Sequence, residues 1–510
     1  MLRTIRITLA ALFGIGLSLL FLDFTGTAHN WLGWMAKTQA LEAVLAMNFG
    51  VVAFLVMLTL LCGRIYCSVI CPLGILQDVF GWMGKKTKKN RYTYSKELRY
   101  VRGLMLVIFL VALLAGVAAV YDLLAPYAAF GRIITLVFQP LWELCNNVLA
   151  AIAEHYESYA FYSTDVWMKS LPVLIVAIVT LVLLAVLAWR NGRTYCNTAC
   201  PVGTLLSFLS RFSFLKIYFD TQKCRNCSLC TKNCKASCID YKTHTVDYSR
   251  CVVCGDCIKS CKFGALKFDN PKLHNMSHKS NGANETNKAH RSPETNESHA
   301  PQDASRRSFL ISSVLVATAA MAQEVKKVDG GYIDLENKVA PKRQTPLTPP
   351  GSLSAQNLSQ HCTGCQLCIS ECPNDVLRPS SDLMHFMQPT MSYERGHCRP
   401  ECNRCSQVCP AGAIKPIDID EKSSIQIGHA VWIQKNCVPI ADGVECGNCA
   451  RHCPAGAIEM VPLDENDEES PYVPAINEEA CIGCGACEYV CPSRPFSAIY
   501  IEGHEVHIII

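Results

Sequence analysis

Long apolar stretches alternate with polar segments over the first part of the chain. A helix that spans a bilayer needs about 20 consecutive apolar residues, and most of these stretches approach that length with almost no charge. They are residues 5–22, 43–62, 101–121 and 171–189. The pattern predicts an α-helical membrane domain with four spans over residues 1–210. The apolar stretch 133–153 is interrupted by polar residues, so we expect an interfacial or re-entrant element there.

The loops between these stretches differ in charge. Residues 63–102 carry nine Lys or Arg, whereas residues 122–170 carry only Arg132 and Lys169. Because positive charge collects in cytoplasmic loops, the N-terminus and the chain just after residue 189 should lie in the cytoplasm. The net charge of +4 gives no argument for nucleic-acid binding.

A motif is duplicated after the second and fourth spans. Arg64-Ile-Tyr66-Cys67-x3-Cys71-Pro-Leu-Gly recurs 129 residues later as Arg193-Thr-Tyr195-Cys196-x3-Cys200-Pro-Val-Gly. We therefore expect both cysteine pairs at the cytoplasmic interface. Since residues i and i+4 share a helix face, the four thiols (Cys67, Cys71, Cys196 and Cys200) can converge. They could bind a further metal centre, form a redox-active dithiol, or simply pack.

A second cysteine pattern recurs six times. Four runs have the spacing C-x2-C-x2-C-x3-C, with which a chain wraps a cubane iron–sulfur cluster, and two lengthen the first gap. Numbered along the chain, run one is Cys224, Cys227, Cys230 and Cys234; run two is Cys251, Cys254, Cys257 and Cys261; run three is Cys362, Cys365, Cys368 and Cys372; run four is Cys398, Cys402, Cys405 and Cys409; run five is Cys437, Cys446, Cys449 and Cys453; run six is Cys481, Cys484, Cys487 and Cys491. These cysteines are the predicted iron ligands of six [4Fe-4S] clusters.

Other uses of the cysteines fit less well. Disulfides at these gaps would be crowded and strained, and zinc sites usually take two pairs of ligands. The fourth sulfur of a two-cluster ferredoxin comes from the partner run, so the runs should work in pairs. Cys62, Cys145 and Cys238 are interpreted as structural, although Cys238 could replace Cys234 as a ligand.

The chain divides further along its length. Residues 211–268 should form a two-cluster ferredoxin domain, 269–304 a disordered linker, 323–351 a tether and 352–510 a four-cluster domain, both cluster domains being α+β and ferredoxin-like. Residues 305–322 begin Ser-Arg-Arg-Ser-Phe-Leu and continue into an alanine-rich apolar core. This is the pattern of a twin-arginine signal, here predicted to be a fifth span that places runs three to six in the periplasm, with cleavage after Ala322 left open. Alternatively, the helix only packs and all clusters stay in the cytoplasm.

These motifs resemble a known pair of proteins. Residues 1–268, with the duplicated Cys-x3-Cys-Pro motif and two runs, resemble the NapH and MauN family of four-span membrane ferredoxins. Residues 305–510, with the twin-arginine start and four runs, resemble the NapG and MauM family. The resemblance implies a fusion that passes electrons from quinol to a periplasmic reductase or cytochrome c. It also implies that run three pairs with run six, so that Cys372 would serve the cluster of Cys481, Cys484 and Cys487.

The function expected from the sequence is therefore electron transfer in the bacterial inner membrane. The expected partners are the quinone pool, a periplasmic reductase and the twin-arginine export machinery. No HExxH, phosphate-loop or nucleophile-elbow motif occurs, so the chain is expected to be an electron-transfer subunit rather than a stand-alone catalyst. The alternatives are a redox sensor, a maturation factor for a reductase, or a relay fed by cytoplasmic ferredoxin.

Overall fold

The computed structural model describes residues 2–23, 25–87, 92–158, 161–270, 338–464, 466–467 and 470–510. Residues 1–271 and 339–510 form one compact unit. The predicted twin-arginine segment 305–322 and nearly all of the predicted linker 269–304 lie outside the described residues, as do residues 323–337 of the predicted tether.

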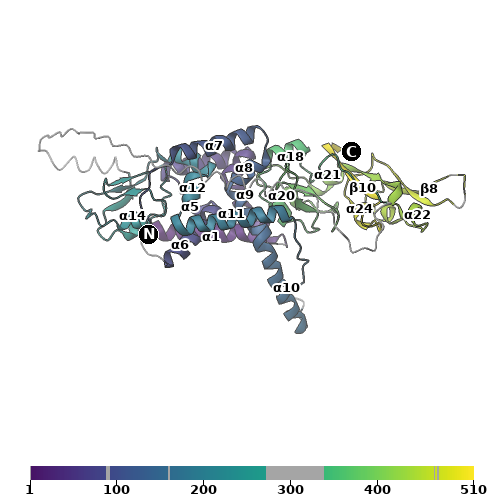
Figure 1. Cartoon of the computed structure of the whole chain (residues 1–510), viewed down its shortest axis with the longest axis horizontal. Helices are drawn as coiled ribbons and strands as arrows, with labels where there is room; N and C mark the ends of the chain where they lie inside the picture. Colours follow the sequence, from purple (N-terminus) through teal and green to yellow (C-terminus); the bar gives the residue numbers. More distant parts are fainter. Residues whose placement is uncertain are drawn as a thin grey trace, which may run out of the picture. The chain divides into compact units, whose positions relative to one another are not determined.

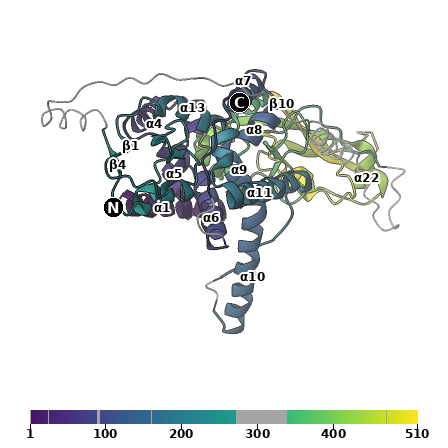
Figure 2. The same cartoon turned by 60° about the vertical axis from the view of Figure 1, so that its left-hand side comes forward.

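The first 210 residues are helical, as the apolar pattern predicts. Three helical stretches of the described chain are long and apolar enough to cross a membrane, namely Leu2–Leu22, Pro126–His155 and Leu171–Asn191. The helices of this part are α1 Leu2–Leu22, α2 Thr27–Lys37, α3 Ala40–Leu45, α4 Phe49–Cys62, α5 Tyr66–Val69, α6 Pro72–Thr87, α7 Arg99–Leu114, α8 Ala118–Leu124, α9 Pro126–Ile133, η1 Ile134–Phe138, α10 Gln139–His155, α11 Leu171–Asn191, α12 Thr194–Thr198 and α13 Pro201–Ser210. Figures 1 and 2 show α10 projecting away from the other helices.

The boundaries of three apolar segments differ from the prediction. The stretch 43–62 is divided between α3 and α4, because Asn48 begins a new helix by accepting a hydrogen bond from the Val51 amide. The stretch 101–121 is likewise divided, at Gly116, whose φ of 71° a helix cannot contain. The stretch 133–153, which we expected to be interfacial or re-entrant, is continuously helical and belongs to the stretch Pro126–His155 that is long and apolar enough to cross a membrane. Its proline, Pro140, lies just after the π-helical segment η1, and the helix continues through it.

Runs one and two form a small α+β domain. Strand β1 (Lys216–Phe219) pairs antiparallel with β4 (Leu266–Asp269), and each run contributes one short helix, α14 (Leu229–Lys232) or α15 (Asp256–Ser260). A short hairpin, β2 Ile239–Asp240 with β3 Thr245–Val246, separates the two runs. The apolar core consists of strand residues together with several of the predicted ligand cysteines, so the predicted iron sites are also the centre of this small domain.

Runs three to six form the second α+β part. Its longest pairing joins β7 (Ile425–Trp432) to β10 (Ile499–Ile509), antiparallel. The other elements are α18 Ala355–His361, α19 Leu367–Ser370, β5 Leu377–Pro379, β6 Pro389–Met391, α20 Arg404–Val408, α21 Ile419–Ser423, η3 Gln434–Asn436, α22 Val438–Ala441, α23 Asn448–Arg451, β8 Ile458–Pro462, β9 Tyr472–Ile476 and α24 Ala486–Val490.

The two-run domain and the four-run part, which we call the cluster-type parts, contact opposite ends of α1. Near its start, Arg3 Nε lies 2.7 Å from Asp256 Oδ1 in the two-run part. Near its end, Phe21 packs on Phe130 of α9, and the neighbouring Gly131 lies against the Cys365 carbonyl so closely that a Cβ would be 2.2 Å from that oxygen. With a rise of 1.5 Å per residue, the 21 residues of α1 extend over about 30 Å.

Candidate iron–sulfur and electron-transfer sites

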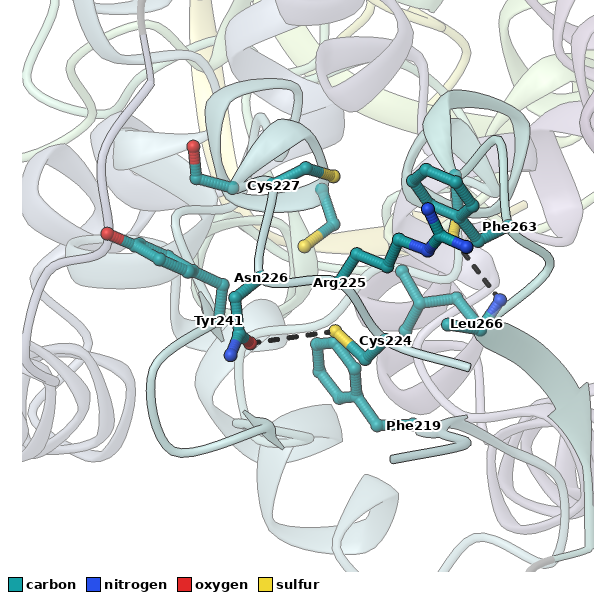
Figure 3. Close-up of a pocket in the computed structure, with 12 residues that line it drawn as sticks. Phe219, Cys224, Arg225, Asn226, Cys227, Tyr241, Phe263 and Leu266 are labelled. Atoms are coloured by element: carbon teal, nitrogen blue, oxygen red, sulfur yellow. Dashed lines mark hydrogen bonds between the residues drawn. The ribbon is translucent and has the colours of Figure 1, made fainter. Parts of the chain in front are cut away.

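The structure brings cysteines from neighbouring runs together in shared cavities. One cavity is lined by Cys224, Cys227 and Cys230 of run one and by Cys261 of run two. Figure 3 shows Cys224 and Cys227 at this cavity with the rings of Phe219, Tyr241 and Phe263 around it. Three cysteines from one run and the last cysteine from its partner are the donor set of a two-cluster ferredoxin, so these residues fit a [4Fe-4S] cluster.

The same exchange occurs between runs three and four. One cavity there is lined by Cys362, Cys365, Cys368 and Cys409. A second is lined by Cys398, Cys402, Cys405 and Cys372. The expectation that Cys372 serves the cluster of run six is therefore wrong. Run three pairs with its neighbour in sequence, run four.

Runs five and six pair in the same way. Cys491 of run six interacts electrostatically with Cys437 of run five, and Cys453 of run five interacts with Cys481 and Cys484 of run six. In the two-run part, Cys234 interacts with Cys254 and Cys257 and so completes the set of run two. Pairing of runs that are adjacent in sequence thus holds throughout the described chain.

The backbone around these cavities favours thiolate ligands. The amides of Ala265, Ala457 and Ala498 donate to the last cysteine of runs two, five and six, each at 3.3 Å from sulfur. Hydrogen bonds to sulfur tune the reduction potential of an iron–sulfur cluster. Burial raises the pKa of the Cys365 thiol to about 12, so this ligand set would release protons when it binds metal.

All 31 cysteines lie in the described part of the chain, and none forms a disulfide. Among the described residues, no group of three or more His, Cys, Asp or Glu side chains is gathered closely enough to hold a single metal ion. Neither the disulfide nor the zinc alternative therefore gains support.

Cys238 lies next to Cys234, a predicted ligand of the run-two site. Its side chain is 1% exposed, and its sulfur is 3.6 Å from the Cys234 sulfur. It also interacts with Cys251. The structure therefore places five cysteines around the run-two site, which the spacing of the run alone does not indicate.

The duplicated motif builds a buried cluster of four thiols, Cys67, Cys71, Cys196 and Cys200, which we name the cysteine tetrad. Each is at most 4% exposed, and Cys71 interacts with the other three. The tetrad lies away from the N-terminal end of α1. Helix α6 runs antiparallel to α1, since Asp78 pairs with Arg6 whereas Ile75 contacts Gly14. Cys71 precedes Ile75 and therefore lies further from the N-terminal end of α1.

Two arginines cross between the repeats at the tetrad. Arg64 Nη2 donates to the Cys196 carbonyl at 3.0 Å, and Arg193 Nη1 donates to the Cys67 carbonyl. Glycine is required where they cross, because a Cβ at Gly74 or Gly203 would lie 2.8 Å from the guanidinium nitrogen and closer still to the carbonyl. This explains why Arg and Gly recur in both copies of the motif.

The two tyrosines of the motif hydrogen bond instead to helices α3 and α8. The Tyr66 hydroxyl accepts a hydrogen bond from the Ala40 amide at 3.1 Å, at the start of α3. The Tyr195 hydroxyl donates to the Leu124 carbonyl at 3.0 Å, at the end of α8. Both helices contact run three: Glu42 of α3 interacts with Thr363, and Asp122 of α8 lies so close to Gly364 that a Cβ there would be 2.7 Å from its carboxylate.

A cleft of about 380 Å³ separates the start of α1 from α6. Its walls are apolar residues of both helices, and its polar end is formed by an ion-pair network. The Asp78 carboxylate forms ion pairs with Arg6, Arg193 and Lys235, at N–O distances of 2.7, 2.8 and 2.6 Å. Burial alone would raise the pKa of Asp78, but these cations hold it well below its ordinary value.

Two buried atoms at the cleft have no hydrogen-bond partner. They are Arg6 Nε, a donor, and Gln77 Oε1, an acceptor. The Gln77 amide nitrogen lies 3.3 Å from the Cys196 sulfur, so the cleft adjoins the cysteine tetrad. It also adjoins the run-two site, because Lys235 and Asp256, next to Cys234 and Cys257, line it.

Comparison with known proteins agrees with this organisation. Residues 44–90 and 172–217, the two copies of the duplicated unit, match a 4Fe-4S binding domain family. Residues 361–425 and 444–494 match a 4Fe-4S dicluster domain family; the first range holds runs three and four, which share cavities, and the second holds run six with all of run five except Cys437. Residues 244–267 match a further 4Fe-4S binding domain family. No solved structure matches the chain.

Similar proteins are ferredoxin-type. The methylamine utilization ferredoxin-type protein MauM of Methylobacillus flagellatus is 31% identical over 162 residues, which cover 31% of this chain and 68% of the relative. The ferredoxin-type protein NapG of Escherichia coli is 28% identical over 197 residues, or 36% of this chain and 80% of the relative. The ferredoxin-type protein NapF of Escherichia coli is 28% identical over 166 residues, which cover 32% of this chain and 90% of the relative. The chain belongs to the MauM and NapG family of ferredoxin-type iron–sulfur proteins.

Proposed function

We propose that this protein carries electrons across the bacterial inner membrane, from the quinol pool to a periplasmic reductase. The observation that supports this most directly is the contact of the two cluster-type parts with opposite ends of α1, whose length of about 30 Å equals the apolar thickness of a bilayer. Clusters bound at the six cysteine runs would supply the one-electron chemistry.

In this proposal the two-run domain is cytoplasmic and the four-run domain periplasmic. Residues 305–322 act as the twin-arginine signal and anchor that connects them. The basic loop 63–102 favours this orientation through the distribution of positive charge.

The cleft between α1 and α6 is the proposed quinol site. Its volume suits an aromatic head group, and Ile7, Val79 and Trp82 on its walls remain partly exposed, as lipid-facing residues would be. A quinone oxygen accepts hydrogen bonds and a quinol hydroxyl also donates one. Arg6 and Gln77 line the cleft and carry side chains that can donate and accept such hydrogen bonds. Oxidation would send both electrons to neighbouring cysteine sites and release both protons to water.

The test uses the full chain, purified anaerobically in detergent and mixed with menadiol, with reduction followed by cluster absorbance. Reduction of the wild-type protein is expected; its absence would refute the quinol function. Ala11→Trp fills the cleft and should slow reduction at least tenfold, whereas Leu12→Trp on the outward face of α1 should not. Equal rates in both variants would place the quinol site elsewhere.

Reporters after residue 510 and within residues 270–300 test the orientation. If both reporters lie inside the cell, a periplasmic four-run domain is refuted.

A second candidate function rests on the run-one site. Cys227 is exposed there, so a cluster at this position could exchange electrons with a soluble cytoplasmic ferredoxin. Rapid reduction by reduced ferredoxin, with none by menadiol, would favour this reading. A reductase that lacks its cofactor when this chain is deleted would instead favour a maturation role.

A further inference from the structure

The contacts at the two ends of α1 leave a gap between the cluster-type parts. Electron tunnelling through protein falls off exponentially with distance, so transfer along the whole of α1 requires an intermediate redox site. The cysteine tetrad lies in the helical part between them, and no run cysteine is involved in it.

One side of the tetrad contacts the two-run domain. Arg64 Nη1 donates to the Ser249 carbonyl at 2.9 Å, two residues before Cys251. Asn197, which follows Cys196, donates to the Ala236 carbonyl at 3.4 Å, two residues after Cys234. The tetrad is thus connected to both sides of the run-two ligand set.

The other side of the tetrad leads to run three. Tyr66 and Tyr195, each directly before a tetrad cysteine, hydrogen bond to the ends of α3 and α8. Helix α8 continues the connection, because the Tyr121 hydroxyl donates to the Cys362 carbonyl at 3.1 Å. Hydrogen bonds and packed side chains therefore join the tetrad to a predicted ligand of the run-three site.

The charge around the tetrad favours an anionic occupant. Arg193 is paired with Asp78, but Arg64 forms no ion pair among the described residues and donates only to Asn197, two carbonyls and the Cys67 sulfur. Arg64 is fully buried. A buried charge without a counter-ion is costly, and an iron–sulfur centre with four thiolates carries the required negative charge.

We infer that Cys67, Cys71, Cys196 and Cys200 bind an additional iron–sulfur cluster that relays single electrons between the run-two and run-three sites. One electron enters and one leaves, with no bond made or broken. The binding of iron is independent of the proposed function, whereas the relay role rests on it.

The test compares two double variants of the full chain. Cys71→Ser with Cys200→Ser removes one ligand from each repeat, and Cys62→Ser with Cys145→Ser is the matched control at cysteines outside the tetrad and the runs. Iron per chain and the EPR and Mössbauer spectra of the dithionite-reduced proteins are measured. We expect the tetrad variant to lose one cluster equivalent of iron and its signal, while the other signals remain and the control matches wild type.

Unchanged iron and spectra in the tetrad variant would overturn the inference. Loss of all signals would show misfolding, so Arg64→Gln and Arg64→Lys provide a second measurement. Gln removes the positive charge and should lower the midpoint potential of the tetrad signal, whereas Lys should retain the potential. Equal potentials in the two variants would overturn the assignment of Arg64 as counter-ion.

The relay role requires that menadiol-driven reduction of the four-run signals falls at least tenfold in the tetrad variant. Normal reduction there would refute the relay while leaving the quinol proposal intact.

Discussion

The phenolic hydroxyl of Tyr121 lies 2.6 Å from the carbonyl oxygen of Ser359, to which it donates a hydrogen bond. Tyr121 belongs to α8 of the helical part, and Ser359 belongs to α18, which leads directly into run three. This contact joins residues 238 positions apart in sequence. It positions the run-three loop on the helices that surround the cysteine tetrad.

Tyr121→Phe should weaken this docking. The variant keeps the ring but leaves the Cys362 carbonyl with only a long bond from Gln388, while Ser359 keeps a bond of 3.1 Å. A lost buried hydrogen bond costs about 1–3 kcal/mol, and the remaining Gln388 bonds favour the low end. Thermal denaturation and limited proteolysis of the four-run part measure the effect. Tyr156→Phe, at a residue 77% exposed, should change neither, and equal behaviour of the two variants would contradict the role of Tyr121.

Cys372→Ser distinguishes the two possible pairings of the runs. Because Cys372 shares a cavity with Cys398, Cys402 and Cys405, the cluster at run four should be lost or converted. The signal of the run-six cluster should remain, whereas Cys453→Ser should alter that signal instead. EPR of the reduced proteins separates these outcomes. Loss of the run-six signal in Cys372→Ser would restore the pairing of run three with run six.

Asp78→Asn should destabilise the helical part strongly. It leaves Arg6, Arg193 and Lys235 without their shared carboxylate, and loss of one partner from a buried ion pair costs about 3–5 kcal/mol. Lys223→Gln, which breaks an exposed pair with Asp220, should cost less than about 1 kcal/mol. Because the pKa of Asp78 is depressed on folding, its contribution is present above the ordinary value of 3.8 and is lost at lower pH. Denaturation of both variants at neutral pH tests the difference.

Glu42 makes stability fall as the pH rises. Burial raises its pKa from 4.5 to about 7, so folding favours the protonated form. Stability is full below pH 4.5 and decreases until the pH exceeds about 7, by up to about 3 kcal/mol. Glu42→Gln cannot ionise and should be more stable than wild type at pH 8 but similar at pH 4.5. A constant difference between the two proteins across this range would contradict the assignment to Glu42.

The cysteine spacing predicted the composition of the sites better than their connections. Local gaps determine which sulfurs can face one cavity, and the cavities contain the predicted residues; their roles as iron ligands remain predictions. The pairing of Cys372 was taken from a resemblance, and no local gap encodes it. Mean apolarity likewise predicted helices but not the interruptions at Asn48 and Gly116, which depend on capping and on φ.

The duplicated motif contained more information than its cysteines. Its spacing predicted that the thiols converge, as they do. The repeated Arg and Tyr were visible in the sequence, but their use of opposite sides of the tetrad depends on tertiary contacts, such as those of Arg64 with a segment 132 residues away and of Tyr195 with a segment 71 residues away. Glu42 directly precedes the apolar stretch 43–62, and Asp122 directly follows the stretch 101–121. Polar residues at such positions are ordinarily solvated, so only the tertiary structure shows that these two are buried.

The crossing of Arg64 and Arg193 also bears on the symmetry of the duplicated unit. Each copy of the unit contributes half of the site, as each subunit does across the two-fold axis of a symmetric dimer. The two copies differ at the neighbouring cleft. Gln77 and Asp78 of the first copy correspond to Leu206 and Ser207 of the second, 129 residues later. The polar end of the cleft is thus specific to the first copy, whereas the cysteine tetrad needs both copies.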